Sequence, residues 1–310
     1  MHVSDFRWKR GMSAAELSEA LAGIGFQSSE MGRAADNIVK MKKSGAKIFL
    51  TFTSNMVTSG LRGFFAQLIE LGMADIIVTT AGGIEEDIMK ALGEKFSIGK
   101  FHPDDTELYE QGINRVGNIY IRNESYAVFE EFMNRTIEQL YIRQKRWAAS
   151  EFLNELGKLL KDEHSILYQA AKKSVPVFCP AITDGALGFH LFMFQQEHHD
   201  FVIDVVKDFE IITNSTTHDD KKGIIALGGG VSKHFAIFTS MLNGGMDYAV
   251  YMTTSSETSG SASGATTDEA KSWGKIKDEC DAVTVIGDVT ITFPVAMASA
   301  LEALSKEAVI

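Results

Sequence analysis

Short apolar runs alternate with helical segments along most of the chain, and this alternation restricts the possible folds more than any other feature. The runs are rich in Val, Ile, Phe or Tyr with almost no polar alternation, which is typical of strands buried on both faces. Six candidate strands follow from this pattern: Lys47–Phe52, Asp75–Thr79, Val175–Cys179, Gly223–Leu227, Tyr248–Thr253 and Ala282–Ile286. The helical segments between them are Ser59–Leu71, Glu85–Leu92, Phe201–Phe209, His234–Leu242 and Val295–Leu304. Such alternation predicts an α/β fold with a doubly wound, mostly parallel sheet and helices on both faces.

The domain organisation follows from the length of the chain and from one unusual stretch. With 310 residues the chain fits one large domain or two small ones. The stretch from Tyr126 to Ser174 contains no run with a strand pattern, so we expect two or three successive helices there. No tandem repeat, low-complexity tract or long linker interrupts the chain. The sequence therefore predicts a single domain over residues 1–310 with a helical insertion at about 126–174.

Composition and charge exclude some classes of protein. Hydrophobic residues make up 45% and charged residues 23%, the balance of an ordinary globular protein. No apolar run approaches the ~20 residues that a membrane span needs, and residues 1–12 lack a secretory apolar region, so we expect a cytoplasmic protein. The net charge of −11 argues against a nucleic-acid binder and would suit a polycationic substrate. Cys179 and Cys280 are too few for a disulfide framework, and Cys179 is expected in the core.

Small, polar or glycine-rich segments follow all six candidate strands. They are Thr53-Ser54-Asn55, Thr79-Thr80-Ala81-Gly82-Gly83, Pro180-Ala181-Ile182-Thr183-Asp184-Gly185, Gly228-Gly229-Gly230, Thr253-Thr254-Ser255 and Gly287-Asp288. In a doubly wound sheet, ligands bind outside the carboxyl ends of the strands. Glycines let the backbone approach a phosphate, and helix N-termini offer it free N–H groups. The loops together predict a nucleotide or dinucleotide site.

Each loop taken alone has a plainer interpretation. The triplet of glycines at 228–230 is followed by Lys233 where the G-x-G-x-x-G fingerprint has its third glycine, so it could simply form a tight turn. Asp184 and Asp288 could accept a hydrogen bond from a ribose or an amine, or could cap helices. Glu85 and Glu86 could likewise stabilise a helix N-terminus.

Two further constellations contain residues suited to catalysis. In Ser272-Trp273-Gly274-Lys275, the aromatic neighbour could desolvate Lys275 and make its neutral amine available for Schiff-base chemistry, although an exposed lysine after a turn has the same pattern. His234 could act as a general base or be structural. Glu197-His198-His199-Asp200 lacks metal-ligand spacing, so we expect a polar loop there and no metal site.

Taken together, the motifs resemble those of the deoxyhypusine synthase family, and the compact length resembles its archaeal-type members. The resemblance runs in order from about Lys47 to about Pro294. It is carried by Thr53-Ser54-Asn55, Val78-Thr79-Thr80-Ala81-Gly82-Gly83-Ile84-Glu85-Glu86-Asp87, Gly112-Ile113-Asn114-Arg115-Val116-Gly117-Asn118, Ile182-Thr183-Asp184-Gly185, Leu227-Gly228-Gly229-Gly230-Val231 with Lys233-His234, Asp247-Tyr248-Ala249-Val250-Tyr251 and Ser272-Trp273-Gly274-Lys275-Ile276.

The resemblance implies a Rossmann-like, NAD-binding transferase of hypusine biosynthesis. NAD would take a hydride from spermidine, diaminopropane would leave, and the aminobutyl group would be held as an imine on Lys275. The group would then pass to a lysine of translation initiation factor 5A. His234 would be the base, Glu269 would hold an amine end, and Trp273 and Tyr251 would contribute to the substrate site. The resemblance further implies a homotetramer with active sites at a dimer interface. The implied NAD-binding residues are Ser54, Asn55, Thr79, Ala81, Gly82, Glu86, Asp184, Gly229, Thr254 and Asp288.

Several residues depart from the pattern of the family. Phe189 stands where many members have Asp, and Phe238 stands where an Asn is usual. The loop Ser259–Thr267 lacks two carboxylates, at Ser259 and Ala262, and an arginine, at Thr266. Because an ammonium in a pocket needs a partner, these changes point to an altered polyamine site. Two alternatives therefore stay open: transfer to a free diamine, as in homospermidine synthase, or a weakly active NAD-binding regulatory paralogue.

Overall fold

The computed structural model describes residues 2–310, which form two compact units. The first unit consists of the chain up to Phe52, Leu71–Val78 and Glu210–Ile310. The second unit consists of Thr53–Glu70 and Thr79–Phe209. The organisation of residues 1–310 as a single domain stays a prediction.

A parallel sheet forms the centre of the first unit. Its strands lie in the order β11 (Ile276–Ile286), β10 (Met246–Thr253), β9 (Lys222–Leu227), β1 (Lys47–Phe52) and β2 (Ile76–Val78). The pairing of β1 with β9 runs in register from Lys47 opposite Lys222 to Phe52 opposite Leu227. The side chains of β9 are buried throughout, as expected for a strand covered on both faces. The predicted parallel sheet is confirmed, and β11 begins six residues before the predicted Ala282.

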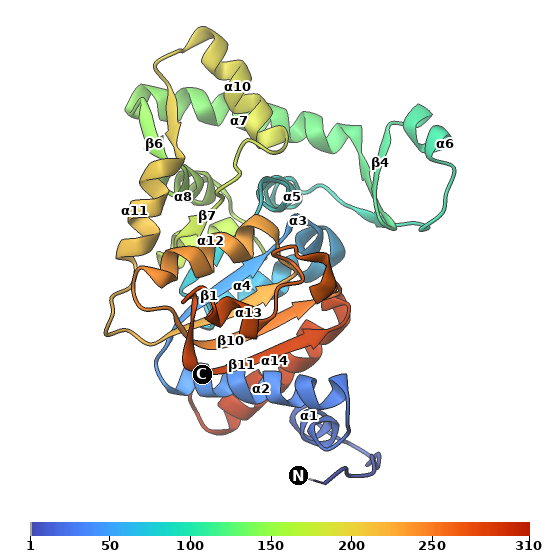
Figure 1. Cartoon of the computed structure of the whole chain (residues 1–310). Helices are drawn as coiled ribbons and strands as arrows, with labels where there is room; N and C mark the ends of the chain where they lie inside the picture. The colour runs from blue at the N-terminus through green and yellow to red at the C-terminus, as the bar shows by residue number, and fades with distance from the viewer. Residues whose placement is uncertain (1) are drawn as a thin grey trace. The chain divides into compact units, whose positions relative to one another are not determined.

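Helices cover both faces of this sheet (Figure 1). Helices α1 (Ala14–Ala22), α2 (Gln27–Lys43) and α14 (Val289–Lys306) pack together on one face, and α12 (Gly230–Met241) lies on the other. The helices α1 and α2 were not among the predicted elements. In α2, the buried residues Ala34, Ile38 and Met41 recur at helical spacing, so periodicity within this segment could have identified it.

The second unit is mainly helical. Its opening segment is the short helix α3 (Ser54–Met56), a π-helical turn η1 (Val57–Leu61) and α4 (Arg62–Glu70), and its next helix is α5 (Ala81–Ala91). Further along lie α7 (Asn123–Arg143), α8 (Ala149–Leu159), α9 (Ile166–Lys173), the short strand β7 (Val177–Phe178) and α10 (Ala186–Glu197). Three helices, α7 to α9, therefore occupy the stretch predicted as a helical insertion.

Short strands in the second unit were missed or misassigned. The strand β6 (Arg146–Ala148) lies within the stretch expected to be helical throughout, and it pairs in parallel with β8 (Val202–Asp204). Residues 202–204 were predicted to be helical, whereas α11 (Val205–Asn214) begins only after them. Each strand has three residues and is stabilised by pairing with a distant segment, so local periodicity cannot reveal it.

A small antiparallel sheet completes the second unit. Its strands lie in the order β3 (Ser97–Ile98), β5 (Ile119–Arg122) and β4 (Ile113–Val116), and the helix α6 (Asp105–Glu110) connects β3 to β4. The hairpin between β4 and β5 turns at Gly117, whose φ of 60° favours glycine. None of the helices formed by residues 2–310 is both long and apolar enough to span a bilayer.

Candidate active site

Lys275 and His234 meet in the first unit. Lys275 lies between the short helix α13 (Thr267–Lys271) and β11, after a turn at Gly274 whose φ is +66°. Its Nζ is 3.4 Å from Nε2 of His234 and 4.9 Å from the centre of the Trp273 ring. The structure therefore brings together three of the residues predicted to form the catalytic and substrate site.

His234 is placed by the glycine-rich turn that precedes α12. Gly230 adopts a φ of +64°, which lets the chain turn from β9 into the helix, and His234 lies in the following turn. Its ring stacks on Phe238, with ring centres 5.7 Å apart and an angle of 15° between the planes. Partial burial of the ring, and secondarily the charge of Lys275, lower the pKa of His234. The imidazole is therefore neutral near pH 7 and can accept a proton.

A pocket of about 190 Å³ opens beside these residues. Lys275, His234, Trp273 and Glu269 all contribute to its lining, together with the small residues Gly260, Ala262 and Ala265. Glu269 follows the N-terminal cap of α13, where Thr266 Oγ1 accepts from its backbone N–H at 3.3 Å. The pocket thus combines an amine, an imidazole, an aromatic face and a carboxylate, which suits the binding of a cationic amine.

Lys233 is a buried residue of this site to which the sequence analysis gave no role. Its side chain is fully buried, and burial lowers the pKa of Lys233 to about 8. The ammonium donates to the carbonyl of Ala265 at 2.7 Å and lies 4.0 Å from the centre of the Tyr251 ring. Lys233 thereby fixes one wall of the pocket, and only its position next to His234 in the sequence could have suggested this.

Tyr251 was predicted to bind substrate and lies beneath Lys233. The residue is 1% exposed and does not contribute to the pocket lining. Within residues 2–310 its buried hydroxyl has no hydrogen-bond partner. Burial raises the pKa of Tyr251, so the phenol stays neutral. Its role in substrate binding stays a prediction.

The start of α5 in the second unit carries several predicted NAD-binding residues. No side chain caps the first turn, which begins at Ala81, because the hydroxyl of Thr80 accepts from Ser54 N–H at 3.0 Å instead. A Cβ at Gly82 would lie 2.9 Å from Cβ of Ser54, so glycine lets the start of α5 lie against the Ser54 side chain. The hydroxyl of Thr79 is buried and has no hydrogen-bond partner among residues 2–310. Uncapped N–H groups and a buried unsatisfied hydroxyl suit a phosphate-bearing ligand.

Glu86 and Glu85 occupy different environments on α5. The carboxylate of Glu86 accepts from Thr58 Oγ1 at 2.6 Å, and burial raises the pKa of Glu86 to about 7. Glu85 accepts from the backbone N–H of Leu187 at 2.8 Å and therefore caps α10. Glu85 thus caps a helix, as one interpretation of the sequence allowed, but the capped helix is α10 and not α5, to which Glu85 belongs. Burial also raises the pKa of Glu85, and the backbone donors oppose this effect.

The other predicted NAD-binding residues are more exposed or engaged locally. Asn55 accepts a hydrogen bond from Thr53 Oγ1 at 2.5 Å, and Asp184 and Thr254 are exposed. Asp288 caps α14 by accepting from Thr290 N–H at 2.8 Å. Gly229 precedes α12, and a Cβ there would lie 2.2 Å from Cα of Ser263. The roles of these residues in NAD binding stay predictions.

The departures from the family pattern fall at distinct places in the two units. Ala262 lines the pocket, and Phe238 stacks on His234. Phe189 is 56% exposed on α10 in the second unit. In residues 2–310 no group of three or more His, Cys, Asp or Glu side chains is arranged to hold a metal ion.

Comparisons with known proteins identify the family. The family model of deoxyhypusine synthase matches residues 16–300. A protein of Thermococcus onnurineus named "Probable deoxyhypusine synthase" is 42% identical over 289 residues, covering 88% of this chain and 86% of the relative. A protein of Dictyostelium discoideum with the same name is 36% identical, covering 96% and 85%. A solved structure assigned to deoxyhypusine synthase from Entamoeba histolytica superposes with a TM-score of 0.67 at 28% identity and covers 97% of both chains. The chain belongs to the deoxyhypusine synthase family.

Proposed function

We propose that the protein transfers the aminobutyl group of spermidine to a lysine of translation initiation factor 5A, through an imine on Lys275. One observation carries this proposal: the amine of Lys275 lies 3.4 Å from the imidazole of His234, in a pocket that also contains Glu269 and Trp273. The family of the chain gives the reaction, and the pocket provides the groups that such a reaction needs.

Each residue of the pocket has a role that follows from its chemistry. The amine of Lys275 forms a C=N bond with the oxidised carbon, and the amine of diaminopropane departs from that carbon. His234 accepts a proton at Nε2, since its lowered pKa keeps the ring neutral. Glu269 pairs with an ammonium of the substrate, and the face of Trp273 attracts the cationic chain.

NAD is the proposed cofactor, and the start of α5 supports it. The unsatisfied hydroxyl of Thr79, the uncapped first turn at Ala81 and the close approach at Gly82 fit a pyrophosphate group. When bound, NAD would accept the hydride that leaves the carbon next to the secondary amine, and the NADH formed would return it to the same carbon after transfer to the acceptor lysine, so that the overall reaction is redox-neutral. Ser54, Asn55, Glu86, Asp184, Gly229, Thr254 and Asp288 are the further residues proposed to hold it.

The proposed assembly follows from the family, whereas the proposed location and the single domain follow from the sequence. We propose a cytoplasmic homotetramer with active sites at a dimer interface and a single domain per chain. The departure at Ala262 leaves both alternatives open, transfer to a free diamine and a weakly active regulatory paralogue, because this position in the pocket offers no carboxylate to a second ammonium.

The test is to trap the imine. Purified protein is incubated with NAD and with spermidine labelled in its butyl portion, reduced with borohydride, digested and mapped by mass spectrometry. Label on the peptide containing Lys275, which moves to initiation factor 5A when the factor is added before reduction, supports the proposal. Movement to a free diamine instead identifies a homospermidine-type transferase. Measurable NAD binding with no trapped label contradicts the proposal and favours a regulatory role.

A further inference from the structure

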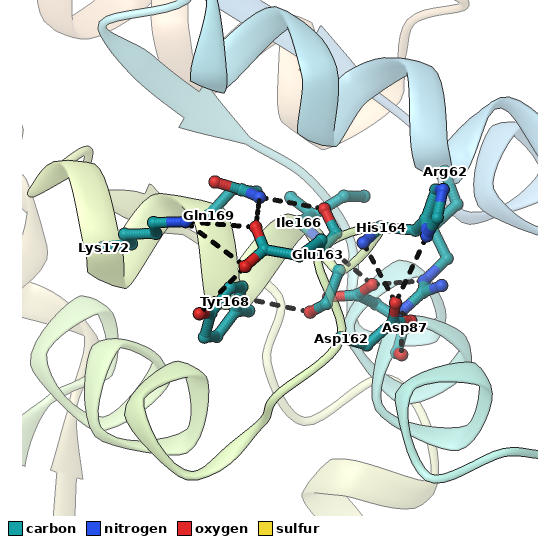
Figure 2. A network of polar contacts seen from close by, with 10 residues as sticks. Arg62, Asp87, Asp162, Glu163, His164, Ile166, Tyr168, Gln169 and Lys172 are labelled. Atoms are coloured by element: carbon teal, nitrogen blue, oxygen red, sulfur yellow. Dashed lines mark hydrogen bonds and ion pairs between the residues drawn. The ribbon is translucent and has the colours of Figure 1, made fainter.

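A buried ion pair joins α4 and α5 in the second unit (Figure 2). Arg62 Nε donates to Asp87 Oδ1 at 2.6 Å, and both side chains are almost completely buried. One terminal nitrogen of the same guanidinium donates to the backbone carbonyl of Asp87 at 3.2 Å and to Asp162 Oδ2 at 2.6 Å. The planar guanidinium thus binds α5 through both the side chain and the backbone carbonyl of Asp87.

The same carboxylate of Asp87 caps a third helix. Its Oδ1 accepts from the backbone N–H of Ile166 at 3.1 Å, and its Oδ2 accepts from Leu167 N–H and from Ser165 Oγ, both at 2.9 Å. These donors belong to the start of α9. One carboxylate therefore receives four hydrogen bonds and fixes α5 against both α4 and α9, which explains why a charged group is tolerated in this buried place.

The position of α5 matters for the proposed cofactor site because the first turn of this helix is tightly packed against its neighbours. A Cβ at Gly82 would lie 2.9 Å from Ser54, and a Cβ at Gly83 would lie 2.9 Å from Thr79 Oγ1. Glu86, the residue before Asp87, is held by Thr58 from the neighbouring π-helical turn. A small shift or rotation of α5 would therefore move Gly82 and Glu86 relative to Ser54, Thr58 and the Thr79 hydroxyl.

We propose that Asp87, gripped by Arg62, is a positioning residue that sets the affinity for NAD by fixing α5. The inference rests on the proposed function, because it assumes that the start of α5 holds the cofactor. Asp87 itself does not touch the ligand. Its loss therefore weakens cofactor binding and leaves the chemical step intact once NAD is saturating.

The variant Asp87→Asn tests this sharply. All four groups around the carboxylate are hydrogen-bond donors. An amide NH₂ in place of one oxygen cannot accept from them, so buried donors lose their acceptor and lie next to another donor. We expect the dissociation constant for NADH, measured by fluorescence titration, to rise at least about tenfold, in line with the cost of small misplacements. The KM for NAD should rise in parallel, with kcat recovered at saturating NAD.

Asp208→Asn is the matched control, because Asp208 makes a similar cap elsewhere in the second unit. Its carboxylate accepts from Ser150 N–H at 3.0 Å and from Ser150 Oγ at 2.6 Å, at the start of α8. Both variants should lower the melting temperature, and only Asp87→Asn should weaken NADH binding. If Asp87→Asn fails to fold, Arg62→Lys is the second variant, because it keeps the positive charge and loses the planar guanidinium. It should raise the dissociation constant for NADH by less than the tenfold expected of Asp87→Asn.

The outcomes separate the two proposals. Wild-type protein that binds no NADH contradicts the proposed cofactor. If the wild-type protein binds NADH and a folded Asp87→Asn or Arg62→Lys variant binds it with the same affinity, the inference is overturned. The ion pair then has a purely structural role. Equal weakening by Asp208→Asn also overturns it, since the effect would then follow general instability.

Discussion

Lys275 and His234 lie 41 positions apart in the sequence, yet Nζ of one is 3.4 Å from Nε2 of the other. The chain achieves this contact because α12 begins at the end of β9, while Lys275 immediately precedes β11 in the same parallel sheet. The imidazole thus comes from the helix that follows one strand of the sheet, and the amine comes from the turn that leads into another strand. This arrangement gives the first two predictions.

Lys275→Arg should abolish the borohydride-trapped adduct and leave NADH binding nearly unchanged. Arginine keeps the positive charge and much of the length, but its guanidinium stays protonated and cannot form an imine. Trapping with labelled spermidine and fluorescence titration with NADH provide the two measurements. Equal loss of both would mean that Lys275 has a structural role, because an imine-forming residue outside the cofactor site should not control cofactor affinity.

His234→Gln should reduce turnover by about 10²–10⁴-fold, the usual contribution of a positioned general base. In the wild-type enzyme, kcat/KM should rise with pH on the acid side through a pKa below the ordinary value of 6.5, since burial favours the neutral ring. The variant should lack this limb of the profile. An acid limb that persists in His234→Gln would assign the titration to another group.

Glu86→Gln should remove a pH dependence of stability. Burial raises the pKa of Glu86 from 4.5 to about 7, so the native state holds this proton more tightly than the unfolded state. The stabilisation is complete below pH 4.5 and is lost as pH rises to 7. Relative to Glu86→Gln, the wild-type free energy of unfolding should therefore fall by about 2–3 kcal/mol across this window.

Urea unfolding of both proteins at several pH values provides the measurement. Asp208, whose pKa is raised to about 6 by burial, titrates in the same range, but it is present in both proteins and cancels in the difference. A difference that does not change with pH would show that the Glu86 carboxyl has an ordinary pKa in the folded protein.

The sequence predicted the parallel sheet from local patterns, and its motifs named four residues that line one pocket, Lys275, His234, Trp273 and Glu269. Apolar runs such as Lys47–Phe52 identify buried strands, and the segment around Lys275 carries a recognisable motif. The strands β6 and β8 were missed because each is stabilised by the other across more than fifty positions. Long-range pairing of three-residue strands leaves no periodicity to detect.

The partners of buried polar side chains could not be predicted from the sequence either. Lys233 donates to Ala265, and Glu85 caps a helix that begins a hundred positions later. Asp87 likewise joins Arg62 to the start of α9. A lysine or a carboxylate in the sequence is expected at the surface, and only the tertiary structure shows which of them are satisfied in the interior.

Ala262→Asp should improve the use of spermidine by giving the pocket a second carboxylate. Ala262 lines the pocket with Glu269, and a carboxylate at this position would offer a partner to a second ammonium of a bound polyamine. The KM for spermidine should fall by several-fold, corresponding to about 1 kcal/mol for a partly exposed ion pair, while kcat changes little.

Ser261→Asp is the matched control, since Ser261 is exposed and does not line the pocket. If both variants lower the KM equally, the gain comes from the overall negative charge. An unchanged KM in Ala262→Asp would mean that the amine substrate of this enzyme does not place a second ammonium at this wall.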